Sequence, residues 1–181
     1  MTARFLVNAG LGVVTALTMA ATVDAQPAGA GRGWLGEFEH ASRQLLQLAE
    51  AIPAEKFAWR PAPGVWSISE LYMHIAIGNY YLLGQAGIKP PVDLATLGKE
   101  PEKSITGKAE VMKFVKDSFD AVRTAYAAAD KQKAVKLFGN DTTVDSVFLR
   151  ILVHNHEHMG QAIAYARMNG VVPPWSKAGG Q

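Results

Sequence analysis

Three of the five histidines in this chain lie within five residues, in the stretch HNHEHMGQ that runs from His154 to Gln161. Successive helical residues turn by about 100°, so His158 lies about 40° from His154, whereas His156 lies about 200° around the helix. The face of His154 continues through apolar residues, namely Val147, Ile151, Ala162 and Tyr165. We therefore expect His154 and His158 to point into a core and His156 to face solvent.

An inward-facing pair of imidazoles one helical turn apart has two explanations. In the first, both are core histidines, and each must find a hydrogen-bond partner and stay neutral inside the protein. In the second, a metal ion takes one nitrogen from each ring, because histidines at positions i and i+4 can supply two adjacent ligands. The cost of burying two imidazoles side by side favours the metal site.

A catalytic metal site of this type needs a third protein ligand. No carboxylate follows Glu157 and no histidine follows His158, so this ligand must come from an earlier helix. His40 lies away from the apolar seam of its segment and is interpreted as a surface residue. His74 lies on or beside the buried stripe of its segment, and we expect it to join His154 and His158.

Three other polar residues near these histidines are candidates for a supporting or substrate-contacting role. Glu70 precedes His74 by one helical turn, although a helix cap already accounts for it. Glu157 lies about 60° from His154 and is expected at a helix-packing boundary. Gln161 lies on the ligand face, where it could orient a ligand or contact the substrate. The sequence assigns a catalytic acid or base to none of them.

The same stretch also has the form H-x-x-E-H, which occurs in inverzincin metalloproteases. In that class a glutamate further along the chain supplies the third ligand, within a much larger α/β domain. No carboxylate follows His158 here. We therefore disfavour the protease interpretation.

Four amphipathic segments must position these residues, and they predict an all-α four-helix bundle. The expected helices cover residues 34–51, 67–83, 106–129 and 142–169. Ser67 and Glu70 form the sequence of a capping box at the start of the second helix. Gly170 is expected as a left-handed cap after the fourth helix. The stretch 130–143 is expected to be a polar, turn-rich connection with at most one short helical piece, since no convincing β-alternation occurs.

The first 25 residues have the order of a cleavable secretory signal peptide. A short basic start is followed by a mostly apolar run and by V-D-A before Gln26. An uncleaved membrane anchor is the alternative, but Asn8 interrupts the apolar run and no basic cluster follows it. The predicted organisation is a signal peptide, a flexible lead-in, the bundle and a C-terminal tail, at residues 1–25, 26–33, 34–174 and 175–181.

Composition limits the partners of the chain. The net charge of +2 is too small to indicate nucleic-acid binding, and no basic stripe interleaved with aromatic residues occurs. With no cysteine the protein has no disulfides, so an apolar core must stabilise it. We expect no stable membrane insertion after processing. The oligomeric state stays open, a homodimer included.

Two long stretches of the chain resemble the DinB-like family of four-helix-bundle proteins. They are IPAEKFAWRPAPGVWSISELYMHIA, which contains W-S-I-x-E-L-x-x-H, and LRILVHNHEHMGQAIAYARMNGVVPP, which contains H-x-x-x-H and R-x-N-G-x-x-P-P. The resemblance covers about residues 34–174 and implies that His74, His154 and His158 bind a divalent metal. The chain departs from the family pattern in the extra His156 and in the expected signal peptide.

These observations predict a periplasmic or secreted metal-dependent transferase or hydrolase that activates a thiol or a water molecule. Thiol transfer is what the resemblance implies for some members of the family. Three neutral nitrogens suit zinc first, with nickel and iron as alternatives. The partner is expected to be a small-molecule substrate, for which a thiol is one candidate. A non-catalytic exported bundle that binds a metal or a small ligand is the alternative.

Overall fold

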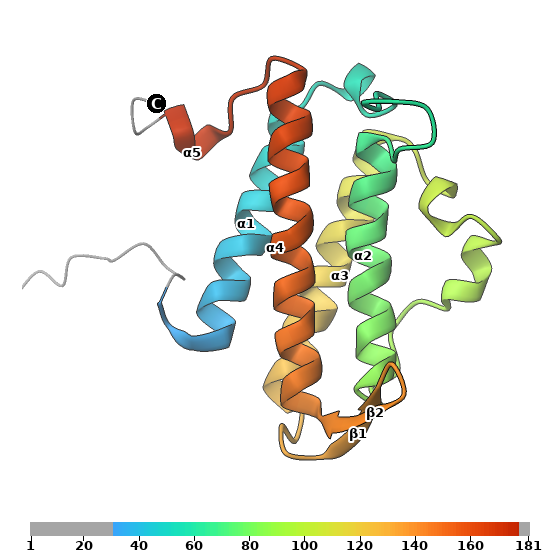
Figure 1. The fold of residues 1–181 in the computed structure, drawn as a ribbon, viewed down its shortest axis with the longest axis vertical. Helices are drawn as coiled ribbons and strands as arrows, with labels where there is room; N and C mark the ends of the chain where they lie inside the picture. The colour runs from blue at the N-terminus through green and yellow to red at the C-terminus, as the bar shows by residue number, and fades with distance from the viewer. Residues whose placement is uncertain (1–30, 178–181) are drawn as a thin grey trace, which may run out of the picture.

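The computed structural model of the protein describes residues 31–177. Four long helices dominate this part of the chain, and a short helix, α5 (Pro174–Lys177), follows them (Figure 1). The long helices are α1 (Gly33–Ala51), α2 (Ile68–Gln85), α3 (Lys108–Ala128) and α4 (Val144–Met168). The prediction of a mostly helical chain built on four long helices is confirmed, with helix ends within about two residues of those expected. The predicted signal peptide lies outside the described residues.

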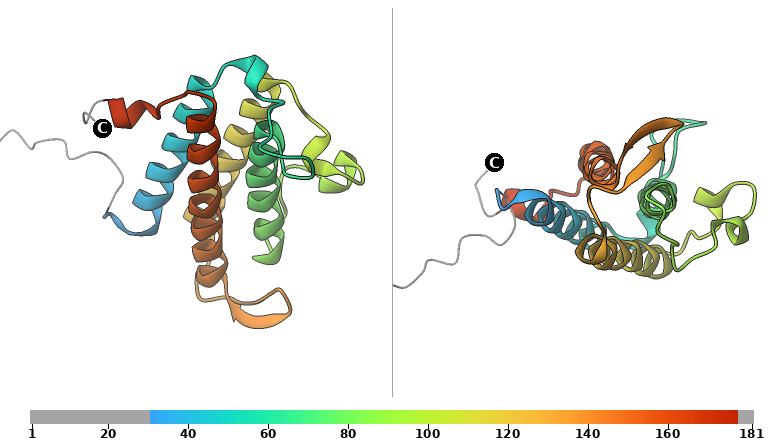
Figure 2. Two further views of the ribbon diagram at one scale, coloured as in Figure 1. Left: turned by 45° about the horizontal axis from the view of Figure 1, so that its top comes forward. Right: turned by 90° about the horizontal axis from the view of Figure 1, so that it is seen from below.

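Helices α1 and α4 run in one direction and α2 and α3 in the other (Figure 1). At one end of the bundle, the Nζ of Lys108 at the start of α3 donates hydrogen bonds to the carbonyl oxygens of Glu50 and Ile52, each at 2.8 Å. Because α2 and α3 run the same way, the chain between them must return along the bundle. This long connection contains two short 3₁₀ helices, η2 (Leu94–Leu97) and η3 (Pro101–Lys103), and it passes beside α2 (Figures 1 and 2). A third one, η1 (Ala54–Lys56), follows α1.

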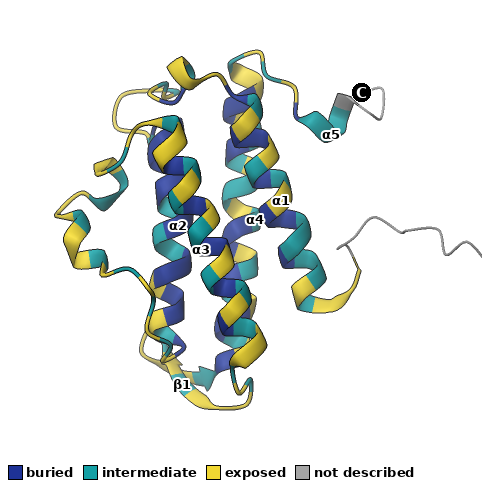
Figure 3. Cartoon of the chain, turned by 180° about the vertical axis from the view of Figure 1, so that it is seen from behind, coloured by how far each residue is buried: buried dark blue, intermediate teal, exposed yellow. Residues whose placement is uncertain are grey.

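The core consists of the inward faces of the four helices, as the burial pattern in Figure 3 shows. The amphipathic character expected of the helices is confirmed for α1 and α3, whose apolar faces supply fully buried residues: Phe38, Ala41, Leu45, Leu48, Val111, Val115, Phe119 and Val122. None of the helices within residues 31–177 combines the length and the apolar character that a membrane crossing needs.

Both predicted helix caps are present. The Oγ of Ser67 accepts a hydrogen bond from the backbone N–H of Glu70, and the Glu70 carboxylate accepts one from the backbone N–H of Ser67. At the other cap, Gly170 has a φ of 75°, which a residue without a side chain adopts at low cost. The N–H of Val171 reaches the carbonyl of Ala166 at 2.9 Å, which completes a Schellman motif.

The expectation for residues 130–143 is wrong, because this stretch forms a β-hairpin instead of an irregular connection. Strands β1 (Ala134–Leu137) and β2 (Asn140–Thr143) pair antiparallel. Their two-residue turn consists of Phe138 and Gly139, both with positive φ. In strand β1 the apolar residues Ala134, Val135 and Leu137 do not alternate with polar ones, and β2 has no apolar residue, so no alternation marks the strands in the sequence.

A buried chain of hydrogen bonds joins three of the helices. The amide of Asn155 on α4 donates to Asn79 on α2 at 3.1 Å, and Asn79 donates to Ser118 on α3 at 3.1 Å. All three side chains are fully buried. Since a buried polar group is costly without its partner, these bonds favour one register of α2, α3 and α4 over all others.

Candidate metal site

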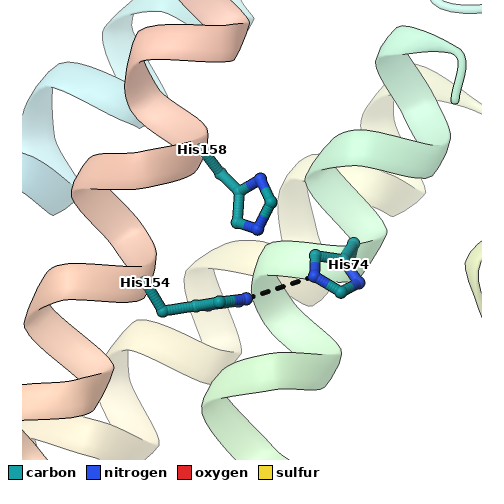
Figure 4. Close-up of side chains that lie close together, drawn as sticks. All are labelled: His74, His154 and His158. Carbon is teal, nitrogen blue, oxygen red and sulfur yellow. Dashed lines mark hydrogen bonds between the residues drawn. The ribbon is translucent and has the colours of Figure 1, made fainter. Parts of the chain in front are cut away.

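Three imidazole rings converge between α2 and α4. His74 comes from α2, and His154 and His158 come from successive turns of α4, with the rings directed toward one another (Figure 4). One potential ligand atom from each residue lies within 4.8 Å of the other two. The structure therefore brings together the three histidines selected from the sequence, and their binding of a metal stays a prediction.

The separation of one pair of ring nitrogens, those of His74 and His154, matches the spacing of ligand atoms around a metal ion. A tetrahedral ion with metal–nitrogen bonds of about 2.0–2.1 Å holds its ligand atoms about 3.3 Å apart. The Nε2 atoms of His74 and His154 are 3.2 Å apart. The Nδ1 of His154 is buried and has no hydrogen-bond partner within the described part of the chain. The Nδ1 of His154 would stay unpaired with a metal on Nε2 as well, so the fit to a metal ion rests on the three rings, each of which can offer one nitrogen to a common point.

The hydrogen bonds of the Nδ1 atoms of His74 and His158 determine which nitrogen of each ring can bind a metal. The Nδ1 of His74 lies 3.2 Å from the carboxylate of Glu102, and the Nδ1 of His158 lies 3.1 Å from the amide oxygen of Gln161. Both oxygens accept, so each Nδ1 donates and each Nε2 keeps its lone pair for the site. The amide of Gln161 in turn donates to the hydroxyl of Tyr165 at 2.9 Å. Such outer partners orient metal-binding imidazoles and raise their basicity.

Burial keeps the two histidines of α4 neutral. Loss of solvent, followed by the nearby His158 and His74 rings, lowers the pKa of His154 to about 4. Burial also lowers the pKa of His158, and its hydrogen bond with Gln161 partly opposes that shift. Neutral imidazole is the form that binds a metal, so no proton has to leave these rings at neutral pH.

The close approach of His154 to α2 depends on Gly78. A Cβ atom built on Gly78 would lie 2.3 Å from the Cε1 of His154, far inside van der Waals contact. The ring of His154 therefore occupies the space that any side chain at residue 78 would need. The sequence shows this glycine inside a helix, where it lowers helix propensity, and that is the signal that could have identified it.

Two further contacts to His74 were not predicted. Glu102 lies in η3, in the long connection between α2 and α3, and its carboxylate hydrogen-bonds with His74, which lies 28 residues earlier in the chain. The indole of Trp66 packs against the His74 ring, with centroids 4.2 Å apart. An irregular connection has no periodicity from which the position of Glu102 could be inferred.

The two glutamates considered from the sequence have partners elsewhere. Burial raises the pKa of Glu70, but hydrogen bonds from the Ser67 backbone and from Arg60 outweigh this and leave the pKa below its usual value. Glu157 is exposed and pairs with Arg150, whose guanidinium hydrogen bonds lower the pKa of this carboxyl. Both are therefore weak bases that are already engaged, and neither is a good candidate for proton transfer.

The remaining two histidines lie outside the group. The Nδ1 of His156 is 2.9 Å from the carbonyl of Leu152, on its own helix. His40 and His156 are half-buried rather than fully open to solvent. The helical-face argument therefore separates His156 correctly from the two histidines that converge.

A pocket of about 350 Å³ opens beside His74 and His154. We call it the hairpin pocket, because the tip of the β-hairpin forms one of its walls. Its other walls come from α2, α4 and η3, and its lining includes Ile77, Tyr81, Leu82, Phe138 and Arg150. This volume lies within the range of about 300–1,000 Å³ typical of small-molecule sites.

Comparison with known proteins identifies the family. The sequence model of the DinB superfamily matches residues 37–162, more than two thirds of the chain, and the protein belongs to this superfamily. The fold is similar to the crystal structure of a DinB-like protein from Bacillus cereus ATCC 10987, with a TM-score of 0.67, 18% identity and coverage of 78% of this chain and 94% of that one.

The fold is also similar to the DinB-like protein YjoA from Bacillus subtilis. That comparison gives a TM-score of 0.57 and 18% identity over 76% of this chain and 91% of that one. None of the curated proteins matches the sequence. The similarity to the two crystal structures concerns the fold.

Replacement of Gly78 by Ala tests the close approach of the two helices. We expect Gly78→Ala to destabilise the protein by about 1–3 kcal/mol through overpacking against His154, and thermal unfolding measures this. Gly84→Ala is the matched control on the same helix, since no atom lies within 4 Å of its added Cβ. The control should be neutral or stabilising by up to about 1 kcal/mol.

The same substitution in a His154→Ala background isolates the contact. With the ring removed, Gly78→Ala should lose most of its destabilising effect, as a double-mutant cycle would report. An equal loss of stability in both backgrounds would contradict the assignment of the clash to His154.

Proposed function

We propose that this protein is an exported metalloenzyme of the DinB superfamily, in which His74, His154 and His158 hold a divalent transition metal. The reaction is a transfer or a hydrolysis on a small molecule. Zinc is the first choice, with nickel and iron as alternatives, because three neutral imidazoles suit all of them.

The observation that carries this proposal is the convergence of three imidazoles at the edge of the hairpin pocket. A divalent ion held there would supply either a bound water with a lowered pKa or a binding site for a thiol as thiolate. The chain's own residues orient the ligands: Glu102 fixes the ring of His74, and Gln161 fixes that of His158. Within the described residues, three protein ligands leave a coordination position for water or substrate.

The pocket also supports the proposal of an enzyme over that of a protein that only stores or senses a metal. A structural metal site is closed by protein ligands on all sides, whereas a catalytic one keeps an open position. Here two of the three histidines, His74 and His154, border a space in which a substrate would fit. Absence of any turnover by the metal-loaded protein, despite a filled site, would favour the alternative of a non-catalytic binding bundle.

Metal analysis of five single variants tests the ligand set. The purified protein should hold about one divalent ion per chain, as expected for a single His₃ site. Replacement of His74, His154 or His158 by Ala should weaken binding by more than about 100-fold, since loss of an outer partner alone costs about 10–100-fold. Metal content after dialysis at neutral pH is the measurement.

The two histidines outside the group are the controls for that experiment. His40→Ala and His156→Ala should leave the metal content nearly unchanged. If His156→Ala lost the metal as fully as His154→Ala, a surface cluster would replace the site between the helices. If the unmodified protein held no metal under any loading condition, the enzyme proposal would fail.

The role of Glu102 has its own test. Glu102→Gln should reduce metal affinity by about 10–100-fold, because a neutral amide no longer raises the basicity of the His74 ring. Glu100→Gln is the control, since Glu100 lies two residues earlier on the same connection and pairs with Lys103. Competition with a chromogenic chelator measures both affinities. Equal affinities in the two variants would show that Glu102 does not support the site.

Export is the part of the proposal that rests on residues 1–25. The order of basic start, apolar run and V-D-A predicts a mature protein that begins at Gln26 in the periplasm or outside the cell. Amino-terminal sequencing of the protein made in its native host tests this directly. Recovery of a chain that begins at Met1 or Thr2 from the cytosol would refute the export proposal.

A further inference from the structure

The hairpin pocket contains a feature that metal binding does not require, namely an aromatic wall formed by Tyr81 and Phe138. Tyr81 is on α2 and Phe138 is at the tip of the β-hairpin, and the two rings are nearly parallel, with centroids 6.4 Å apart. Both remain open to solvent, at 47% and 60% exposure. Grouped, exposed aromatic side chains at the mouth of a pocket are typical of ligand contacts.

Phe138 is held in a costly backbone conformation. Its φ is 52°, and it is the only residue other than glycine with a positive φ in the described part of the chain. A two-residue hairpin turn of this kind favours Asn or Gly at that position, whereas a bulky side chain is strained there. Such strain often accompanies a functional position. The turn geometry thus gives no reason for a phenylalanine, and the ring's place beside the pocket does.

The tip of the hairpin also contacts α2 through a hydrogen bond of its backbone. The backbone N–H of Phe138 lies 3.4 Å from the side-chain oxygen of Gln85, near the end of α2. This contact and the ring pairing with Tyr81 hold the tip of the hairpin over the pocket. The aromatic wall therefore has a defined position relative to His74 and His154, which line the same pocket.

The charges around the pocket indicate which chemical group a ligand would direct toward the histidines. A divalent ion on three neutral imidazoles would carry a charge of +2, of which the Glu102 carboxylate beside His74 would offset only a part, so an anionic donor is complementary to the site. The guanidinium of Arg150 lines the same pocket and adds a further positive charge, although Glu157 partly neutralises it. The carboxylate of Glu102 also lines the pocket and is held against the Nδ1 of His74, and the other lining residues, such as Ile77 and Leu82, are apolar.

We propose that the hairpin pocket binds a substrate with a planar, apolar group, which packs on Tyr81 and Phe138 while its anionic donor reaches the three histidines. This inference rests on the proposed metal site and adds the substrate class. A ligand of this kind would be small, because the whole pocket measures only about 350 Å³.

Two hydroxamates test this substrate class. Benzohydroxamate and acetohydroxamate carry the same anionic metal-binding group, but only the first has an aromatic ring. Calorimetric titration of the full, zinc-loaded protein should show benzohydroxamate binding about tenfold more tightly, or 1.4 kcal/mol. Phe138→Asn and Tyr81→Ala should abolish this preference and leave acetohydroxamate unaffected.

The variants are chosen so that loss of folding does not imitate the expected result. Asparagine tolerates a positive φ, so Phe138→Asn removes the ring without disturbing the turn. Tyr81→Phe should retain the preference, because the ring remains. Met168→Ala removes an equally exposed apolar side chain at the far end of α4 and should change neither affinity.

A metal-free titration separates failure of this inference from failure of the proposed function. Methyl resonances of Ile77 and Leu82 should shift saturably when phenol is added to the metal-free protein, and not in Phe138→Asn. Equal affinities for the two hydroxamates in the zinc-loaded protein would overturn the substrate class and leave the metal site intact. Phenol binding without any hydroxamate binding would instead refute a metal with an open coordination position beside the pocket, and would support the aromatic pocket.

Discussion

The close contact between α2 and α4 at Gly78 and His154 is the constraint on which the rest of the site depends. The His154 ring takes the place that a side chain at residue 78 would occupy. Only with the helices this close does the Nε2 of His154 come within 3.2 Å of that of His74. One residue further along each helix, Asn79 and Asn155 form a buried hydrogen bond. Steric fit and hydrogen bonding therefore fix the same register.

Other parts of the fold hold α2 in position and place further side chains around the histidines. The capping box at Ser67 begins α2 two turns before His74, and the buried bond to Ser118 ties α2 to α3 as well. The parallel course of α2 and α3 requires a long return connection, and that connection places Glu102 against His74. The hairpin between α3 and α4 places Phe138 beside the same pocket. Both segments are consequences of the topology, and both contribute side chains to the surroundings of the histidines.

Much of this arrangement could be predicted from the sequence, because it depends on interactions between residues that are close together in the chain. Helical periodicity and, for α2, the capping box at Ser67 indicated the four helices, and periodicity separated His154 and His158 from His156. What the sequence did not reveal depends on how distant segments meet. Glu102 and Phe138 lie in connections without a usable period, and the importance of Gly78 emerges only when a ring from another helix is packed over it. The hairpin was missed because its strands show no alternation of apolar and polar residues.

The coordination of a bound metal tests most directly whether His74, His154 and His158 form one metal site. X-ray absorption spectroscopy of the zinc-loaded protein reports the number and type of ligand atoms around the ion. We expect three imidazole nitrogens at about 2.0–2.1 Å and at least one oxygen ligand from water or an added small molecule. A first shell with fewer than three imidazoles, or one closed by a fourth imidazole, would contradict this expectation.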